Sequence, residues 1–256
     1  MIQHWRRIAL AACLLTTAVG LGARTWVQHQ SAASAAVQPQ KIVAIGDSIT
    51  YGLRDDAALG GWVGRLASMI RVLYPSQYYT TINAGINGDA SSGVVKRLKH
   101  DVIDQKPNLV ILAIGTNDFD YHVPAATFES NLRTIIATIK QQTHAAILVQ
   151  SFLPEAHVAG SVLKQEAAYN ALVPAICRQL NVGYEDLFNT FLALGRAAMA
   201  NLRHDSEHPT AAGYRFMAAF TLAVLESGYL SQQGTIVQAS SAPGTDDLLP
   251  DNELGL

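Results

Sequence analysis

Short apolar runs alternate with amphipathic segments from residue 41 to about residue 228 of this chain. Each run is five or six residues long, which is typical of a strand that is buried on both faces. Gly, Asn, Asp or Ser follows most of these runs, so the chain can turn directly after them. The predicted strands are Lys41–Ile45, Tyr79–Ala84, Leu109–Ile114, Ala145–Gln150 and the weaker Val182–Leu187.

The segments between and after these runs repeat apolar residues every three or four positions, which predicts helices with one buried face. These helical patterns span residues 62–73, 94–103, 128–139, 169–180 and 214–225. Strands that alternate with helices predict an α/β fold with a parallel sheet of about five strands, covered on both faces. Right-handed crossovers then bring the carboxyl ends of all strands to one edge of the sheet, where open α/β sheets bind their ligands.

The two ends of the chain differ from this pattern. In residues 1–23, Arg6 and Arg7 precede an apolar run of about 16 residues, which predicts a secretory signal peptide, with an uncleaved N-terminal anchor as the alternative. Residues 24–40 are rich in Gln, Ala and Ser and are predicted to be a linker. We expect one domain over residues 41–233, a disordered tail over residues 234–256, and a secreted or extracytoplasmic location.

Composition and charge narrow the function classes. A formal net charge of −2 and 49% hydrophobic residues describe an ordinary globular protein, so we expect no nucleic-acid partner. Cys13 lies in the N-terminal apolar run, which leaves Cys177 as the one thiol of the body and permits no internal disulfide there. Cys177 follows a helical apolar pattern, which predicts a thiol packed in the core.

Three segments that are far apart in the sequence supply complementary parts of a hydrolytic site. Ser48 follows the first predicted strand, where a hydroxyl would project onto the ligand edge, although Asp47-Ser48 is also a common helix cap. Asp205 and His208 lie three residues apart before a predicted helix. That spacing lets a carboxylate reach one imidazole nitrogen while the other faces outward. Glu207 and Asp186 are alternative carboxylates.

The third segment, around Asn117, and one further turn could donate hydrogen bonds to an oxyanion. Asn117 follows the third predicted strand, so its side-chain amide emerges at the same edge of the sheet. A turn with two glycines, Gly85 and Gly88, follows the second predicted strand and could expose a backbone N–H. A nucleophile, a base with its carboxylate and two donors at one edge together predict a serine hydrolase.

These blocks resemble the SGNH hydrolase superfamily, also called the GDSL esterases and lipases, and most resemble its small bacterial thioesterase and lysophospholipase-like branch. The similarity covers residues 41 to about 228, with Ile49 where leucine names the motif. The resemblance implies a three-layer α/β/α sandwich of flavodoxin-like type. It also implies a Ser–His–Asp esterase that needs no metal or other cofactor. The roles it implies are catalytic for Ser48, Asp205 and His208, and oxyanion binding for Ser48, Gly88 and Asn117.

The substrate is less constrained than the chemistry. Tyr51, Phe119, Tyr121 and His157 are candidates for a substrate-binding surface, although packing within loops is the simpler interpretation of each. We expect a carboxylic ester or thioester of a small or lipid-like molecule. A carbohydrate acetylesterase that acts on cell-wall or plant polysaccharide is the alternative within the same chemistry. A non-catalytic surface module that binds glycan or lipid is the alternative of another class, whereas a nucleotide binder would need a glycine-rich phosphate loop.

Overall fold

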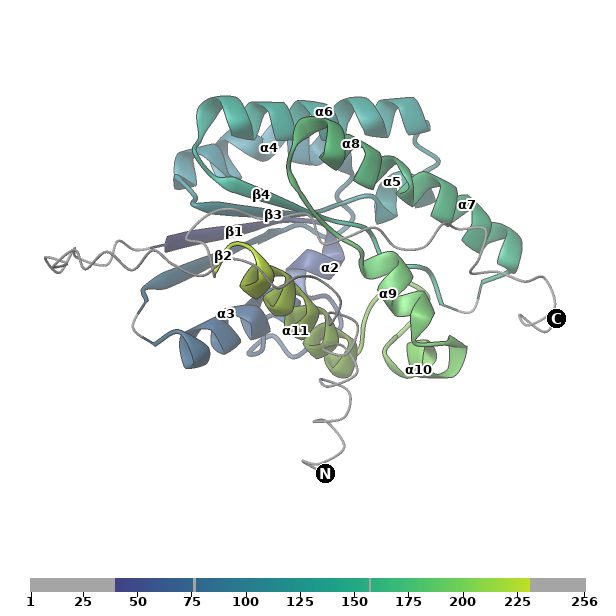
Figure 1. Ribbon diagram of the computed structural model, residues 1–256. Coiled ribbons are helices and arrows are strands. Elements are labelled where there is room, and N and C mark those ends of the chain that lie inside the picture. The colour runs from purple at the N-terminus through teal and green to yellow at the C-terminus, as the bar shows by residue number, and fades with distance from the viewer. Residues whose placement is uncertain (1–39, 76, 157, 231–256) are drawn as a thin grey trace, which may run out of the picture. The chain divides into compact units, whose positions relative to one another are not determined.

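The computed structural model describes residues 40–75, 77–156 and 158–230. Its strands form one parallel sheet in the order β2-β1-β3-β4-β5, which confirms the predicted architecture (Figure 1). β1 begins at Gln40, inside the predicted linker, because this residue pairs with Tyr79 at the sheet edge. The strands are β1 (Gln40–Gly46), β2 (Tyr79–Gly85), β3 (Leu109–Ala113), β4 (Ala146–Gln150) and β5 (Gly183–Glu185).

Helices cover both faces of the sheet and give three layers (Figure 1). One face carries α4 (Ser91–Asp101), α6 (Ala125–Gln142) and α8 (Leu172–Leu180), and the other carries α3 (Gly61–Leu73) and α11 (Ala211–Ser227). Successive side chains of a strand point to opposite faces, so each buried strand contributes to two cores. In β1, Ile42 and Ala44 pack in the core with α3 and α11, while Val43 and Ile45 pack in the core with α4 and α6.

The helix α6 illustrates how the sequence pattern produces this packing. Its five buried side chains recur at helical spacing and belong to one core. Full burial of an aliphatic or aromatic side chain of this size contributes about 1.5–3 kcal/mol. The apolar stripe of α6 is therefore sufficient to fix which face of the helix meets the sheet. Its members are Phe128, Leu132, Ile135, Ile136 and Ile139.

The sequence pattern over residues 169–180 predicts a single helix, but the structure has two there. It divides into α7 (Gly160–Asn170) and α8, with Pro174 in the first turn of α8. Proline has no N–H for the carbonyl of Asn170 and its ring would clash there, whereas a first-turn position needs no such bond. The pattern over residues 94–103 also ends early, because α4 stops at Asp101 and a 3₁₀ turn, Ile103–Gln105, follows.

Four short helices were not predicted, and two of them carry site residues. They are α2 (Ser48–Tyr51), α5 (Thr116–Asp120), α9 (Leu187–Ala193) and α10 (Arg196–Asn201). Such segments are too short to show a helical period in the sequence. The thiol of Cys177 is fully buried in α8, and burial raises its pKa to about 12, as befits a core residue.

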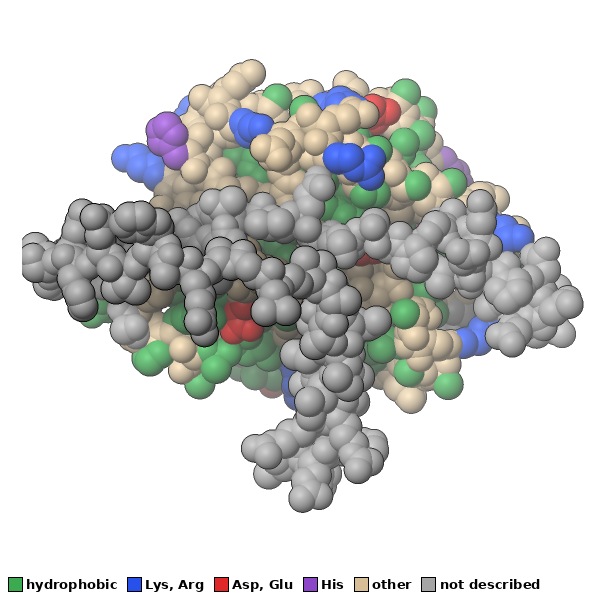
Figure 2. All heavy atoms as spheres, in the orientation of Figure 1, with side chains coloured by type: hydrophobic (Ala, Val, Ile, Leu, Met, Phe, Trp, Pro, Cys, Tyr) green, Lys and Arg blue, Asp and Glu red, His purple; other side chains and the backbone are tan. Residues whose placement is uncertain are grey.

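The predictions for residues 1–23, residues 24–39 and residues 234–256 lie outside the described residues. All described residues belong to one compact unit. Among the helices of that part, none combines the length and apolar character that crossing a bilayer requires. On the face visible in Figure 2, basic side chains lie scattered among polar and hydrophobic ones.

Candidate active site

Ser48 lies at the carboxyl end of β1, where the strand turns directly into α2. Asp47 caps this short helix by accepting the N–H of Ile49 at 2.9 Å. The close approach of β3 requires Gly46, because a Cβ at this position would lie 2.0 Å from the carbonyl oxygen of Ala113. Ser48 is the first residue of α2, and the backbone N–H groups at the start of a helix have no intrahelical acceptor. Ser48 as a whole residue is 7% exposed.

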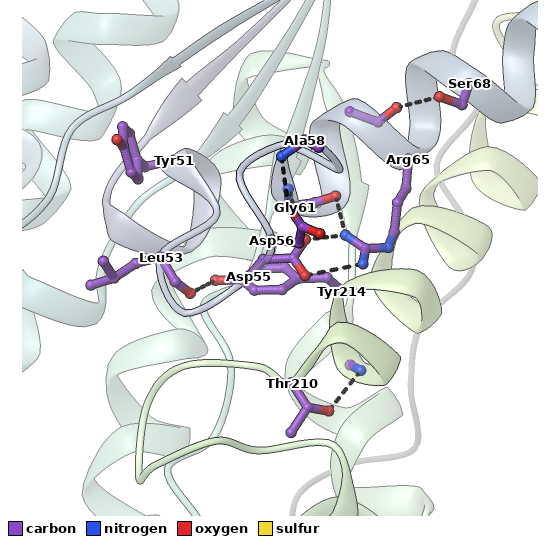
Figure 3. Close-up of polar contacts among 12 residues, drawn as sticks. Tyr51, Leu53, Asp55, Asp56, Ala58, Gly61, Arg65, Ser68, Thr210 and Tyr214 are labelled. Carbon is purple, nitrogen blue, oxygen red and sulfur yellow. Dashed lines mark hydrogen bonds and ion pairs between the residues drawn. The ribbon is translucent and has the colours of Figure 1, made fainter.

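His208 meets Ser48 across a separation of 160 residues. Ser48 Oγ and His208 Nε2 are 2.9 Å apart, within hydrogen-bond distance. His208 lies in the loop between α10 and α11, just before Thr210, whose hydroxyl accepts the N–H of Gly213 and caps α11 (Figure 3). The cap at Thr210 thus ends the loop that presents the imidazole to Ser48.

Asp205 orients the imidazole from the other side. Its two carboxylate oxygens lie 3.0 and 3.1 Å from His208 Nδ1. This nitrogen therefore donates its hydrogen to Asp205, which leaves Nε2 free to accept the Ser48 hydroxyl proton. Desolvation acts to raise the pKa of Asp205, but the backbone N–H groups of His208 and Glu207 and the adjacent imidazole outweigh it and lower that pKa. The carboxylate is ionised at neutral pH.

The loop that carries Asp205 and His208 is held from inside by Arg203. Its guanidinium donates to the carbonyl oxygens of Glu207 at 2.7 Å and Pro154 at 2.5 Å. It also lies over the ring of Phe191, 4.9 Å from the centroid. Arg203 and Pro209 form an isolated antiparallel bridge that closes the base of the loop. These contacts join the loop after β4 to the loop before α11.

The predicted oxyanion donors follow β2 and β3, beside Ser48. Asn117 is the second residue of α5, is 7% exposed, and donates one amide hydrogen to the carbonyl oxygen of Asp89 at 3.0 Å. An amide carries two hydrogens, so the other is available to a ligand. Gly88 precedes Asp89 and has φ +74°, a conformation that favours glycine. Gly85 N–H instead donates to Asn83 Oδ1 at 2.9 Å.

A buried carboxyl group fixes the helix that carries Asn117. Asp118 accepts hydrogen bonds from the backbone N–H of Ser91 at 2.8 Å and from the Ser91 hydroxyl at 2.5 Å. Asn131 donates to the same hydroxyl at 2.9 Å. Burial raises the pKa of Asp118, and the Ser91 hydrogen bonds oppose that rise. This network ties α5 to the beginning of α4 and to α6, so the position of Asn117 is set by three elements.

The predicted substrate-binding residues divide into two groups. Tyr51 and Tyr121 are exposed by 54% and 60%, and the Tyr121 hydroxyl lies 3.4 Å from the carbonyl oxygen of Gly88. Phe119 points instead into an aromatic cluster with Phe152 and Tyr169, at centroid distances of 6.2 and 5.9 Å. Tyr121 thus lies beside Gly88, whereas Phe119 has a packing role. His157 lies outside the described residues.

The loop between α2 and α3 brings a cation to Asp205. Asp55 forms a buried ion pair with Arg65 and accepts the N–H of Gly61 at 3.1 Å, and Tyr214 donates to the carbonyl oxygen of Leu53 at 2.7 Å (Figure 3). These contacts fix both sides of Arg54, which has φ +71°. Its Nε lies 3.6 Å from an oxygen of Asp205.

Sequence reasoning missed a second group of carboxyl side chains, which lies near Asp205 and His208. Burial, together with the carboxylates of Glu207 and Glu155, raises the pKa of Asp120 to about 7. Burial raises the pKa of Glu166 to about 8, and this residue accepts the N–H of Glu155 at 3.1 Å. These residues come from α5, the loop after β4, α7 and the loop between α10 and α11, so only the fold brings them together. Glu207 alone, next to His208, could have been suspected from the sequence.

The other sequence alternatives have structural roles. Asp186 caps α9 by accepting the N–H of Asn189 at 3.0 Å. The negative charge of Glu207 helps to raise the pKa of Asp120. Within the part of the chain that the structure describes, no three or more His, Cys, Asp or Glu side chains are grouped so as to hold a metal ion.

Comparison with known proteins places this geometry in context. A family model described as "GDSL-like Lipase/Acylhydrolase family" matches residues 44–216. The chain is 29% identical over 201 residues to an acetylxylan esterase of Geobacillus stearothermophilus, covering 70% of this chain and 90% of that protein. It is 30% identical over 145 residues to the esterase TesA of Pseudomonas aeruginosa, covering 53% of this chain and 70% of that protein. The crystal structure of Axe2, an acetylxylan esterase from Geobacillus stearothermophilus, superposes with a TM-score of 0.65 and 27% identity, covering 73% of this chain and 94% of that one.

Proposed function

This chain belongs to the GDSL-like lipase/acylhydrolase family and is a serine hydrolase of ester bonds; we propose that Ser48, His208 and Asp205 are its catalytic triad. The proposal rests chiefly on one observation, the chain of hydrogen-bond contacts from Ser48 Oγ through both imidazole nitrogens to the Asp205 carboxylate. Nucleophile, base and orienting acid in that order constitute the arrangement that activates a serine hydroxyl.

In the first half of the reaction, Ser48 Oγ attacks the ester carbonyl and its proton passes to His208 Nε2. Negative charge develops on the carbonyl oxygen, which accepts hydrogen bonds from the Ser48 and Gly88 N–H groups and from the free amide hydrogen of Asn117. Each such donor lowers the barrier by about 3 kcal/mol. The imidazolium, stabilised by Asp205, then protonates the leaving alcohol as the ester C–O bond breaks.

In the second half, water enters and His208 removes one of its protons as the oxygen attacks the acyl-enzyme. The same donors bind the second tetrahedral oxyanion. Collapse of that intermediate breaks the bond to Ser48 Oγ, which regains its proton from His208, and the carboxylic acid leaves.

The test of the triad is hydrolysis of p-nitrophenyl acetate by wild type and by Ser48→Ala. We expect kcat to fall by about four to six decades with unchanged folding by circular dichroism. Ser68→Ala is the matched control, because Ser68 lies on the exposed side of α3 and donates only to the carbonyl of Gly64. Equal turnover by Ser48→Ala and Ser68→Ala would refute the assignment.

The substrate is a carboxylic ester of a small or lipid-like molecule, with an acetylated polysaccharide as the second candidate. The similarity to an acetylxylan esterase over 90% of that protein favours the second. A chain-length series of p-nitrophenyl esters, run beside acetylated xylan and acetylated peptidoglycan, separates them. Preference for eight carbons or more supports a lipid, whereas acetate release from glycan supports the polysaccharide.

A non-catalytic binding module is the remaining alternative, and a fluorophosphonate probe distinguishes it from the enzyme. The probe reacts only with an activated serine. We expect it to label wild type and the Ser68→Ala control but not Ser48→Ala. Absence of labelling in wild type would favour the binding module.

The protein acts outside the cytoplasm, directed there by residues 1–23. A basic pair followed by an apolar run of signal-peptide length supports this part of the proposal. Fractionation of cells that express the full chain tests it, with the mature N-terminus determined by mass spectrometry. Recovery of the intact chain in the cytoplasm would contradict export, whereas an intact chain in the membrane fraction would identify an uncleaved anchor.

A further inference from the structure

The three proposed oxyanion donors belong to three different segments of chain. Ser48 follows β1, Gly88 follows β2 and Asn117 follows β3. Stabilisation of a transition state requires donors 2.7–3.1 Å from the oxyanion, so the three segments must keep their separation within a few tenths of an ångström. The regular pairing of the strands ends at Gly46, Gly85 and Ala113. Beyond it one backbone hydrogen bond, from the Ile86 N–H to the Gly46 carbonyl at 3.1 Å, still joins the first two segments, and side chains add the other connections.

One side chain, Arg97, joins these segments. It lies on α4, beneath the loops after β1 and β2, and its side chain is 14% exposed. Its guanidinium makes four contacts with oxygen atoms: the Asp89 carboxylate at 2.7 Å, the Ala84 carbonyl at 2.6 Å, the Asp101 carboxylate at 2.7 Å and the Gly46 carbonyl at 2.8 Å. Only the contact with Asp101 stays within α4.

Two of the other three contacts fix a neighbour of a proposed donor. The Gly46 carbonyl precedes Ser48 by two residues, at the last position of β1. Asp89 follows Gly88 directly, and its own carbonyl oxygen accepts the amide hydrogen of Asn117. By binding Asp89 and Gly46 at the same time, Arg97 sets the distance between the Ser48 segment and the pair formed by Gly88 and Asn117.

Gly93 makes the contact between Arg97 and Asp89 possible. A Cβ at position 93 would lie 1.7 Å from the Asp89 carboxylate, so this carboxylate can rest on α4 only where a side chain is missing. Alanine is a better helix former than glycine by roughly 1 kcal/mol. Gly93 therefore makes α4 less stable than alanine would, at the position where Asp89 approaches Arg97.

Only arginine can serve all of these acceptors. The planar guanidinium presents five N–H donors in a fixed fork, whereas a lysine ammonium presents three on a flexible stem. The acceptors include two main-chain carbonyls on different segments and a carboxylate, and they approach three different nitrogen atoms of Arg97. A single ammonium nitrogen cannot occupy these three positions.

We propose that Arg97 is a positioning residue that holds the oxyanion donors in register for the reaction at Ser48. It contacts no reacting atom and acts through Gly46 and Asp89. This inference rests on the proposed function, and wild type and Ser48→Ala in the ester assay test that function separately. A hydrolase that loses activity in Ser48→Ala retains its assignment whatever Arg97 variants do.

The experiment compares wild type with Arg97→Lys, Arg97→Met and Gly93→Ala. Arg133→Met and Asp101→Asn are the matched controls. Arg133 lies on α6 and pairs with Glu129. Asp101→Asn alters the contact that Arg97 makes within its own helix and the pairing of Asp101 with the neighbouring His100, and leaves the contacts of Arg97 with the other segments in place. The readouts are kcat and KM for p-nitrophenyl acetate, the inhibition constant of phenylboronic acid, and the folded fraction from circular dichroism. Phenylboronic acid forms a tetrahedral adduct with an active serine and places an oxygen among the oxyanion donors.

We expect kcat per folded molecule to fall about tenfold to a hundredfold in Arg97→Met and Gly93→Ala, with KM within about twofold of wild type and boronate affinity reduced in parallel. Arg97→Lys should recover part of kcat, and both controls should match wild type. A purely structural role predicts less folded protein but unchanged kcat and boronate affinity in the folded fraction. That result would overturn the proposal, and Gly93→Ala supplies the same test if Arg97→Met does not fold.

Discussion

Replacement of Asp205 separates the catalytic from the structural role of this carboxylate. Asp205 Oδ1 accepts the backbone N–H groups of Glu207 at 3.0 Å and His208 at 2.6 Å, as well as facing the imidazole. Asparagine can keep both backbone hydrogen bonds through its oxygen, but its amide then donates toward His208 Nδ1. The imidazole would carry its hydrogen on Nε2, toward Ser48, and could no longer accept the hydroxyl proton.

The expected loss of activity follows from that tautomer. A triad with the wrong tautomer loses about four decades of kcat, or about 5 kcal/mol of barrier. Stability should change little in Asp205→Asn. In Asp205→Ala the two backbone N–H groups lose their acceptor, at about 1 kcal/mol each. Both variants should therefore be inactive, and only Asp205→Ala should also be less stable.

Two measurements check this prediction: kcat for p-nitrophenyl acetate and the free energy of unfolding from urea titration. Glu207→Gln is the control, because it alters the neighbouring carboxylate and leaves its backbone N–H in place. A kcat in Asp205→Asn within tenfold of wild type would refute the reasoning. A large loss in Glu207→Gln with little loss in Asp205→Asn would assign the acid to Glu207 instead.

Three further predictions follow from the contacts of single residues. Asn117→Ala should lower kcat for p-nitrophenyl acetate by about a hundredfold to a thousandfold with little change in KM; an unchanged kcat would remove Asn117 from the oxyanion site. Burial raises the pKa of Glu185 from 4.5 to about 7, so the folded state binds this proton more tightly. This proton's contribution to the free energy of unfolding is fully present below pH 4.5. It declines as pH rises toward 7, by on the order of 3 kcal/mol. Glu185→Gln should lessen that decline in urea titrations across this range, and an unaltered slope would contradict it. Asp55→Asn should cost about 3 kcal/mol of unfolding free energy, because it leaves the buried charge of Arg65 without its partner; a Tm equal to that of wild type would disprove the pairing.

Local patterns were enough to predict the sheet and the main helices. A continuous apolar run such as Leu109–Ile114 can be satisfied only by burial on both faces, and a stripe such as that of Phe128 and Leu132 only by packing on one. The motif residues at strand ends followed in turn, since parallel strands with right-handed crossovers expose their carboxyl ends together. The resemblance carried by those motifs added the roles of Ser48, Gly88 and Asn117, and the assays of Ser48→Ala and Asn117→Ala above test two of these roles.

The amino-acid sequence was sufficient to predict the fold class, the family and the candidate reactive side chains, because short-range periodicity or compact motifs encode each of them. Which distant groups meet depends on the three-dimensional fold. The carboxyl side chains of Asp120, Glu155 and Glu166 come from separate elements, and three of the four contacts of Arg97 reach residues outside its own helix. An arginine in an amphipathic helix carries no local sign that its donors face inward, since that depends on the carbonyls and carboxylates which neighbouring loops place above it.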